Sequence, residues 1–251
     1  MIPALAEAPS STKNAVGGIM SKLELNEVFT SINGEVSPCK QGSVATFIRF
    51  SKCSLQCPWC DTKHHIKVNH SFWHDDTIET LKKINGGPLA KNITITGGEP
   101  LLAYERNSRA FLYFLTALHK DGHSIAIETN GVHRLPNEMR DLIKGFVVDY
   151  KFFLLDEGRK PHDAFAACKD LTRHDYVKLV IDKEHHIGLA KQFFSYYMSF
   201  VAPEDLPTFA VSIVNEGGSH LLNPASVIKS FADDGYDVLL NLQIHKFLQV
   251  P

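Results

Sequence analysis

The 251-residue sequence has no apolar run long enough to cross a bilayer as a helix, which takes about 20 residues. It has no block of basic residues either, because 26 Lys and Arg stand against 28 Asp and Glu, a formal net charge of -2. A chain without a basic patch does not bind nucleic acid through bulk electrostatics. We therefore expect neither a membrane nor a nucleic acid among its partners, and we expect a cytoplasmic location.

Cysteines are scarce as well. There are five, an odd number, and three of them fall between positions 53 and 60. This pattern argues against a secreted disulfide framework and favours a metal centre in a reducing cytosol. Residues 1–18 are rich in Ala, Ser, Pro and Gly and lack the charged start of a secretory signal. We expect residues 1–22 to form a disordered or loosely ordered arm and residues 23–251 a single domain, with Met1 or Met20 as the start.

Three cysteines at C-x3-C-x2-C spacing, Cys53, Cys57 and Cys60, directly follow an apolar run. Three thiolates so close in sequence converge on one point only if the backbone loops around it, as a metal or an iron–sulfur cluster requires. A cubane cluster takes four ligands, so three cysteines leave one iron open to something else. Two alternatives are buried, unligated cysteines and a zinc knuckle completed by His64 or His65.

Strand-like and helical segments alternate along the rest of the chain, which predicts βαβ units and a parallel sheet. The fold class we expect is α/β, a partial, open (β/α)6-type barrel that binds ligands at the carboxyl ends of its strands. The expected strands are Leu25–Ile32, Val44–Phe50, Asn92–Thr96, Ser124–Glu128, Phe146–Tyr150, Tyr176–Ile181, Thr208–Val214 and Val238–Ile244. The expected helices are Asp76–Ile84, with Asp76 as the cap, Phe111–His119, Asp141–Lys144, Gly188–Met198 and Pro224–Asp233.

Polar and glycine residues come directly after several of these strands. The cysteine loop, Gly97-Gly98-Glu99, Glu128-Thr129-Asn130 and Lys151 all occupy such positions, so we expect them to share one rim of the barrel. A Gly-Gly pair lets the main chain turn sharply and approach a ligand closely. Glu128 can equally serve as a turn or capping residue, and Lys178 can pack its stem and extend its head into water.

Other residues are open to two interpretations. Arg49, near the end of a buried strand, needs an acceptor for its guanidinium, either an ordinary salt bridge or a substrate carboxylate. Asn33-Gly34-Glu35 follows a strand and is a strong turn signal. The pairs His64-His65 and His185-His186 invite a metal interpretation, but adjacent residues on a strand point to opposite faces. Neither pair has a further metal-type ligand at a convincing spacing, so we expect no metal at either.

The cysteine spacing resembles the cluster-binding signature of radical S-adenosylmethionine (SAM) enzymes. Its last part, Trp59-Cys60-Asp61-Thr62, is similar to the form found in 7-carboxy-7-deazaguanine synthases of the queuosine and deazapurine pathway. Gly97-Gly98-Glu99-Pro100 resembles the segment that holds the amino group of SAM in radical SAM enzymes. Gln243-Ile244-His245-Lys246 resembles the Q-x-H-K segment near the end of these synthases. The resemblance extends over roughly residues 25–251.

This resemblance implies that Cys53, Cys57 and Cys60 hold a 4Fe–4S cluster whose open iron binds SAM, and that Thr62 contacts Mg2+. The residues it implies for SAM binding are Gly97, Gly98, Glu99, Glu128, Asn130 and Lys151. The residues it implies for substrate binding are Ile32, Asn33, Gly34, Glu35, Arg49, Thr96, Gln243 and His245.

The implied activity is that of a carbon–nitrogen lyase. One electron from the cluster cleaves SAM to methionine and a 5′-deoxyadenosyl radical, which abstracts hydrogen from 6-carboxy-5,6,7,8-tetrahydropterin. The pterin ring then contracts with loss of ammonia to give 7-carboxy-7-deazaguanine. The implied partners are the small-molecule pterin and an electron donor such as a flavodoxin or ferredoxin, and a homodimer is one possible assembly.

The sequence departs from the family pattern in three places. Asn33 replaces a usual Gln, Val36 replaces a usual Gly, and Asp149-Tyr150-Lys151 stands where many relatives have a serine-containing strand end. These departures concern the identity of the substrate more than the reaction class. The alternatives are an activase that installs a glycyl radical on a partner protein, and a non-enzymatic binding protein in which the cysteines hold structural zinc.

Overall fold

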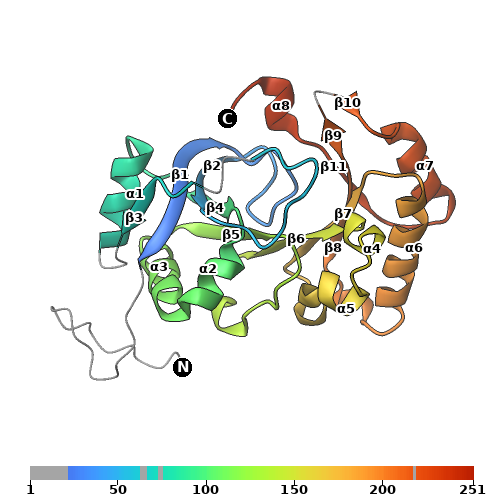
Figure 1. Ribbon diagram of the computed structural model, residues 1–251, viewed down its shortest axis with the longest axis horizontal. Coiled ribbons are helices and arrows are strands. Elements are labelled where there is room, and N and C mark those ends of the chain that lie inside the picture. Colours follow the sequence, from blue (N-terminus) through green and yellow to red (C-terminus); the bar gives the residue numbers. More distant parts are fainter. Residues whose placement is uncertain (1–21, 63–66, 73–75, 217–218) are drawn as a thin grey trace.

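A computed structural model describes residues 22–62, 67–72, 76–216 and 219–251. Within these residues the centre of the molecule is a nine-stranded sheet in the order β11-β8-β7-β6-β5-β4-β2-β1-β3 (Figure 1). Its strands are β1 (Leu23–Ile32), β2 (Val44–Phe50), β3 (His70–Phe72), β4 (Asn92–Gly97), β5 (Ser124–Thr129), β6 (Gly145–Lys151), β7 (Tyr176–Ile181), β8 (Thr208–Ile213) and β11 (Leu239–Asn241). A separate antiparallel pair is formed by β9 (Asn215–Glu216) and β10 (Ser219–His220).

The strands from β2 to β11 in this order run parallel to one another, and β1 and β3 extend the sheet as antiparallel strands. The edge strands β3 and β11 do not pair with each other, so the barrel is open. This confirms the predicted α/β class with an open, mostly parallel barrel. The parallel run holds one strand more than the six expected, because the short β11 pairs with β8.

Helices follow most of the parallel strands and cover the outer side of the sheet (Figure 1). The α-helices are α1 (Thr77–Asn85), α2 (Pro100–Arg106), α3 (Ser108–Lys120), α4 (Phe153–Asp156), α5 (Pro161–Ala164), α6 (His185–Met198), α7 (Pro224–Asp233) and α8 (Ile244–Leu248). Short 3-10 turns lie at Asn137–Met139, Ala166–Asp170 and Pro203–Asp205.

Two hydrophobic clusters fill the space between sheet and helices. One joins β1, β2, β4 and β5 to α1, α2 and α3 around Phe50, Phe111 and Phe114, which are fully buried. The other joins β6, β7 and β8 to α4, α5, α6 and α7. On β5 the consecutive residues Ile125, Ala126 and Ile127 are all buried, as expected for a parallel strand covered on both faces.

Two local expectations about helices are wrong. Residues 141–144 form turns and not a helix. The N–H of Lys144 donates to the carbonyl of Ile125 at 2.7 Å, which brings the chain beside β5 where β6 begins. Asp76 precedes α1 as expected, but its side chain makes no capping hydrogen bond.

The predicted last strand, residues 238–244, is shorter than expected. Only Leu239–Asn241 pair with β8, because the N–H of Ile244 donates to the carbonyl of Gly34 at 2.9 Å. The chain then turns into α8, which lies at the upper edge of the molecule beside the C-terminus in Figure 1 and begins against the loop after β1. Two segments from opposite ends of the sequence are thereby placed side by side.

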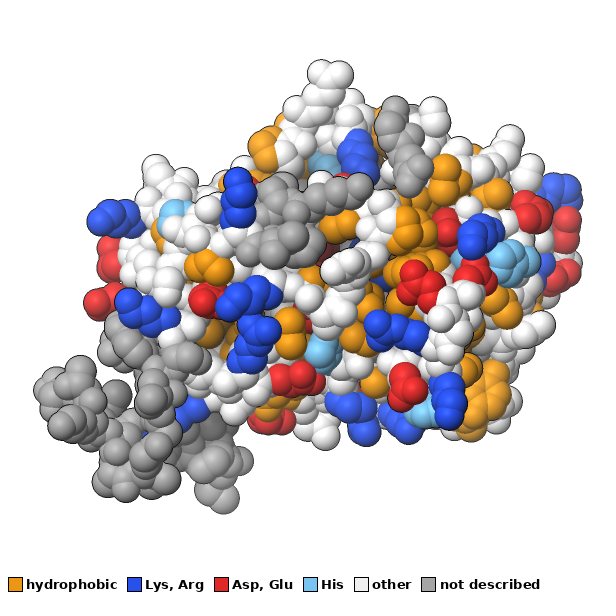
Figure 2. All heavy atoms as spheres, in the orientation of Figure 1, with side chains coloured by type: hydrophobic (Ala, Val, Ile, Leu, Met, Phe, Trp, Pro, Cys, Tyr) orange, Lys and Arg blue, Asp and Glu red, His pale blue; other side chains and the backbone are white. Residues whose placement is uncertain are grey.

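Some expectations fall outside the described residues. These are the N-terminal arm, apart from Lys22, and the pair His64-His65. Across the part of the chain that the structure describes, no helix has the length and apolar character to span a membrane. Figure 2 shows acidic and basic side chains mixed over the face that it displays, in keeping with the balanced charge of the sequence.

Candidate active site

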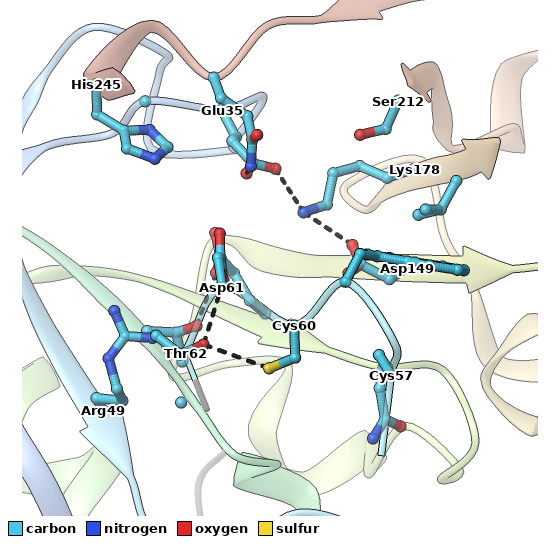
Figure 3. Close-up of a pocket in the computed structure, with 18 of the residues that line it drawn as sticks. Glu35, Arg49, Cys57, Cys60, Asp61, Thr62, Asp149, Lys178, Ser212 and His245 are labelled. Atoms are coloured by element: carbon cyan, nitrogen blue, oxygen red, sulfur yellow. Dashed lines mark hydrogen bonds and ion pairs between the residues drawn. The ribbon is translucent and has the colours of Figure 1, made fainter. Parts of the chain in front are cut away.

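A cavity of about 440 Å³ lies at the carboxyl ends of the parallel strands. Side chains from β2, β6, β7 and α8 point into it (Figure 3). Every residue that the sequence analysis assigned to cluster, SAM, Mg2+ or substrate lines this cavity: Ile32, Asn33, Gly34, Glu35, Arg49, Cys53, Cys57, Cys60, Thr62, Thr96, Gly97, Gly98, Glu99, Glu128, Asn130, Lys151, Gln243 and His245. The structure thus brings the predicted site residues together, while their individual roles stay predictions.

The cysteine loop and the glycine turn are tied together by main-chain contacts. Phe50 on β2 pairs with Gly97 on β4, the N–H of Gly98 donates to the Phe50 carbonyl at 2.9 Å, and the N–H of Glu99 donates to the Lys52 carbonyl at 2.8 Å. A Cβ on Gly98 would lie 1.7 Å from the Lys52 carbonyl oxygen, closer than atoms can approach. Gly97 has φ of +124°, a conformation that favours glycine. Both glycines are therefore required for this close approach.

The three cysteines of the loop face the cavity. The N–H of Cys60 donates to the carbonyl of Cys57 at 3.2 Å, which closes a turn of the loop. The N–H of Leu55 donates to Cys53 Sγ at 3.4 Å, and Nδ2 of Asn130 donates to the same sulfur at 3.8 Å. Burial raises the pKa of the Cys57 thiol to about 11 and also raises that of Cys53. The three cysteines are half-buried, and the N–H donors at Cys53 Sγ suit a thiolate bound to a metal.

Glu99 joins the ends of two neighbouring strands. Its side chain is buried, and Oε1 accepts from the Leu101 N–H at 2.9 Å and from Thr129 Oγ1 at 2.8 Å. Oε2 accepts from the Asn130 N–H at 2.8 Å. Burial raises the pKa of this carboxyl. Both oxygens are engaged within the protein, so Glu99 ties the glycine turn after β4 to the end of β5.

Lys178 lies at the centre of a buried group of charges, with Glu35 and Asp149 on either side (Figure 3). Its Nζ is 2.7 Å from Glu35 Oε2 and 2.8 Å from Asp149 Oδ1, and its side chain is 8% exposed. Burial lowers the pKa of Lys178, but Asp149 and Glu35 outweigh this and hold it well above its usual value. Of the interpretations open for Lys178, the one in which its head extends into water does not hold, because Glu35 and Asp149 on other elements compensate for its burial.

Glu35 also accepts hydrogen bonds from the last strand, β11, and from the residue that precedes α8. Gln243 Nε2 donates to its Oε1 at 2.7 Å and Asn241 Nδ2 to its Oε2 at 3.0 Å. Asn241 Oδ1 accepts from the N–H of Val36 at 2.9 Å, and the Val36 side chain is buried. Although burial raises the pKa of Glu35, the nearby Lys178 ammonium holds it below its usual value. Glu35 therefore presents a charged carboxylate at the cavity wall.

Gly34 and His245 are in such close contact that no side chain fits between them. A Cβ on Gly34 would lie 1.9 Å from His245 Nδ1. Burial lowers the pKa of His245, so the neutral imidazole is favoured beside the cavity. The predicted substrate segments at the two ends of the chain thus form one wall.

Asn33, a departure from the family pattern, is engaged within the protein. It is 3% exposed, its Oδ1 accepts from Thr94 Oγ1 at 2.6 Å, and its Nδ2 donates to Ser43 Oγ at 3.0 Å. The amide of Asn33 therefore fixes the loop after β1 through its contacts with Thr94 and Ser43.

Arg49 and Thr96 lie on paired strands and each contacts a carboxylate. Arg49 Nε donates to Glu27 Oε1 at 2.7 Å, while the side chain, 14% exposed, still reaches the cavity (Figure 3). Thr96 Oγ1 donates to Glu128 Oε2 at 2.8 Å, and burial raises the pKa of Glu128. The salt bridge anticipated for Arg49 is present, and it is compatible with a second contact to a ligand carboxylate.

Thr62 places its hydroxyl beside the last cysteine. Its Oγ1 is 3.9 Å from Cys60 Sγ and donates to Asp61 Oδ1 at 3.3 Å. Lys246 Nζ lies 3.7 Å from Asp61 Oδ2. The hydroxyl and the carboxylate are oxygen donors of the kind that Mg2+ takes.

Sequence reasoning missed several residues of the cavity. Asp149, named before only as a departure from the family pattern, and Ser212 stand at or near the ends of β6 and β8, so the rule that directed attention to other strand ends would have assigned them to the cavity. Pro251 also lines the cavity, and its carbonyl oxygen accepts from Ser31 Oγ at 2.5 Å. Nothing in the sequence around Pro251 signals this contact.

Comparisons with known proteins agree with this geometry. The chain matches the model of the Radical SAM superfamily over residues 47–160. It is 29% identical over 241 residues to the 7-carboxy-7-deazaguanine synthase of Koribacter versatilis. This alignment covers 91% of this chain and 98% of that protein. It is 38% identical over 113 residues to the protein of the same name from Haemophilus influenzae, across 45% of this chain and 47% of that one.

Among solved structures, the crystal structure of QueE from Escherichia coli has the same fold. The TM-score is 0.59 at 19% identity, across 88% of this chain and 93% of that one. Over residues 47–160 the chain is thus similar to the class of radical SAM proteins, and its overall fold is that of the QueE structure. Within that class its sequence resembles the 7-carboxy-7-deazaguanine synthases.

Proposed function

We propose that this chain is a 7-carboxy-7-deazaguanine synthase, a radical SAM lyase that converts 6-carboxy-5,6,7,8-tetrahydropterin to 7-carboxy-7-deazaguanine with loss of ammonia. One observation carries the proposal. A single cavity is lined by the cysteine loop, by the glycine turn fastened to it, and by the contact between Gly34 and His245. The relative from Koribacter versatilis that bears this name aligns with nearly the whole chain.

The donor set of the loop fits a 4Fe–4S cluster. Cys53, Cys57 and Cys60 offer three soft sulfur ligands in one turn of backbone, and N–H groups of Leu55 and Asn130 stabilise the sulfur of Cys53. When bound, the cluster and SAM supply a one-electron cleavage that creates a carbon radical able to abstract hydrogen from the substrate. The task of the protein is then to position the reactants and to exclude water.

The glycine turn and the neighbouring strand ends are our candidates for holding SAM. Gly97 and Gly98 remove the side chains that would keep a ligand away from the main chain. Glu128, Asn130 and Lys151 follow on adjacent strands and complete this side of the cavity. Lys151 is fixed by Asp149, whose Oδ2 lies 2.5 Å from its Nζ.

The opposite wall is our candidate for the pterin. Arg49 offers a guanidinium suited to the substrate carboxylate, and Glu35 offers a carboxylate suited to the N–H groups of a pyrimidine ring. His245 and Gln243 close the wall from α8 and from the residue before it. Ile32, Asn33, Gly34 and Thr96 shape the same side.

Further parts of the proposal concern partners. Mg2+ would bind Thr62 and oxygen atoms of the substrate, since this ion seldom needs a full protein cage. A flavodoxin or ferredoxin would supply the electron, and the enzyme would act in the cytoplasm, either alone or as a homodimer. We assign residues 23–251 to one catalytic domain and residues 1–22 to an arm outside it.

Anaerobic turnover tests this function directly. Protein with a reconstituted cluster is incubated with SAM, a chemical reductant and 6-carboxy-5,6,7,8-tetrahydropterin, and 7-carboxy-7-deazaguanine is sought by mass spectrometry. Cys57→Ala should abolish both SAM cleavage and product, and Cys168→Ala, which changes a thiol outside the cavity lining, should not. SAM cleavage without deazaguanine would refute the substrate. A colourless protein that holds zinc and no acid-labile sulfide would refute the radical chemistry altogether.

A further inference from the structure

Outside the cavity, two histidines and an aspartate converge where α4 lies beside the start of α6 (Figure 1). We propose that Asp156, His185 and His186 form a binding site for a divalent transition-metal cation of the Zn2+ type. Two imidazoles and one carboxylate are a recurrent protein ligand set for zinc, with water in the fourth place. This proposal does not depend on the function proposed above.

The sequence argument against a metal at His185-His186 assumed a strand and looked for a ligand nearby in sequence. Both assumptions are wrong here. The pair begins helix α6, and the third ligand, Asp156, comes from the end of α4, 29 residues before His185.

The distances suit a metal site in its metal-free form. His185 Nε2 lies 2.9 Å from Asp156 Oδ1, and His186 Nε2 lies 3.2 Å from Asp156 Oδ2. The ligand atoms all fall within 4.8 Å of one another. Tetrahedral zinc with bonds of about 2.0–2.1 Å holds its ligand atoms roughly 3.4 Å apart, so small side-chain rotations complete the site.

The surroundings of His186 supply the second argument. Its side chain is fully buried, and its other ring nitrogen, Nδ1, is 2.6 Å from Oδ1 of the buried Asp182. The two atoms lack the alignment of a hydrogen bond. Both ring nitrogens of His186 thus face a carboxylate, Asp156 at Nε2 and Asp182 at Nδ1. A cation on Nε2, in the place that a second proton would take, leaves Nδ1–H for Asp182.

A carboxylate behind a ligating histidine is the usual companion of zinc in proteins, because it fixes the tautomer and the orientation of the ring. Asp182 occupies that position for His186. The pair is rigid, since both side chains are buried, whereas His185 and Asp156 are accessible to an incoming ion at 56% and 26% exposure.

Lys183 competes for the same carboxylate. Its Nζ lies 2.6 Å from Asp156 Oδ2, and its side chain is 52% exposed. A bound cation would displace this ammonium, which can turn into water without loss of packing. Removal of Lys183 should therefore strengthen metal binding, whereas an ordinary salt-bridge cluster would gain nothing from it.

For the fold, such a metal would link the segment after β6 to the segment after β7. Asp156 follows β6, whose last residue Lys151 lines the cavity, and His185 follows β7, which carries Lys178. A metal shared by α4 and α6 would hold these two strand ends in register beside the cavity. We infer a structural ion that raises the thermal stability of the protein.

Zinc binding to the cluster-loaded full-length protein tests the proposal. Equilibrium dialysis under anaerobic conditions measures zinc affinity, and zinc X-ray absorption identifies the ligands, since N and O bonds of about 2.0–2.1 Å differ from S bonds of about 2.3 Å. The variants are His185→Ala, Asp156→Asn and Lys183→Met. His162→Ala is the matched control, because His162 is an exposed histidine beside Asp163 at 3.4 Å and is not part of the group.

We expect one zinc per chain with N and O ligands, an affinity at least tenfold lower in His185→Ala and Asp156→Asn, and a higher affinity in Lys183→Met. His162→Ala should bind as the parent does. Zinc should also raise the melting temperature of the parent and not that of His185→Ala. The proposal is overturned if the parent binds zinc only through sulfur or not at all, or if His185→Ala and Asp156→Asn bind it with unchanged affinity.

Discussion

Lys178 Nζ lies 2.7 Å from Glu35 Oε2, although 143 residues separate the two in the sequence. The contact joins β7 to the loop after β1 across the mouth of the barrel. Oδ1 of Asp149 on β6 lies 2.8 Å from the same ammonium. One cation therefore holds together the wall that we assign to substrate and the strand end that we assign to SAM.

Loss of this cation should destabilise the fold strongly. Lys178→Met leaves two carboxylates inside the protein without their partner, and removing one member of a buried pair costs roughly 3–5 kcal/mol. Lys229→Met is the control, since Lys229 is 72% exposed and pairs with Asp233 on the surface of α7, where such a pair contributes less than about 1 kcal/mol. Urea unfolding of both variants measures the difference. Equal losses would show that the buried group does not hold the wall in place.

The stability contributed by Asp149 should depend on pH. Burial raises the pKa of this carboxyl, but Lys151 and Lys178 outweigh it and lower the pKa to about 2. Because the unfolded value is about 3.9, the contribution of about 2 kcal/mol is complete above pH ~5 and is lost as the pH falls toward 2. The gap in unfolding free energy between the parent and Asp149→Asn should therefore shrink between pH 5 and pH 3. A gap that widens on acidification would contradict this assignment.

A methyl group on Gly34 should disturb the substrate wall. It would meet His245 Nδ1 at 1.9 Å, so Gly34→Ala must move either the loop or α8. We expect kcat/KM for the pterin to fall at least tenfold, a loss of roughly 1.4 kcal/mol or more of transition-state binding, while reductive SAM cleavage without substrate continues. Gly188→Ala in α6 meets no atom within 4 Å and should stabilise the helix by up to about 1 kcal/mol. Turnover of Gly34→Ala at the parental rate would show that the contact is dispensable.

The proposed Mg2+ contact predicts a difference between two substitutions at one position. Thr62→Ser keeps the hydroxyl and should retain activation by Mg2+, whereas Thr62→Val has the same shape without the hydroxyl and should lose most of it, about tenfold in kcat/KM. The measurement is turnover across a Mg2+ titration. The role is wrong if both variants respond to the ion as the parent does.

The sequence was informative where chemistry depends on neighbours in the chain. Cys53, Cys57 and Cys60 belong to one loop, and Gly97 and Gly98 end one strand, so spacing and strand patterns placed them at the cavity. The alternation of strands and helices likewise predicted the open parallel barrel, because buried parallel strands read as continuous apolar runs.

Contacts between distant segments could not be predicted in the same way. The sequence around Lys178 does not show whether its ammonium meets water or two carboxylates, because only the fold brings Glu35 to it. The same holds for Asp156 and His185, which meet through α4 and α6. The last strand was overestimated because its pairing with β8 competes with the hydrogen bond from Ile244 to Gly34, which no local pattern reveals.

The hydrogen bond from Ser31 Oγ to the Pro251 carbonyl bears on where a purification handle can be attached. Residues fused after Pro251 would begin beside Ser31 at the cavity, so we expect a purification handle there to disturb the contact between the end of the chain and β1. A preparation that loses pterin turnover yet keeps its brown colour should therefore prompt a check of where its handle was attached.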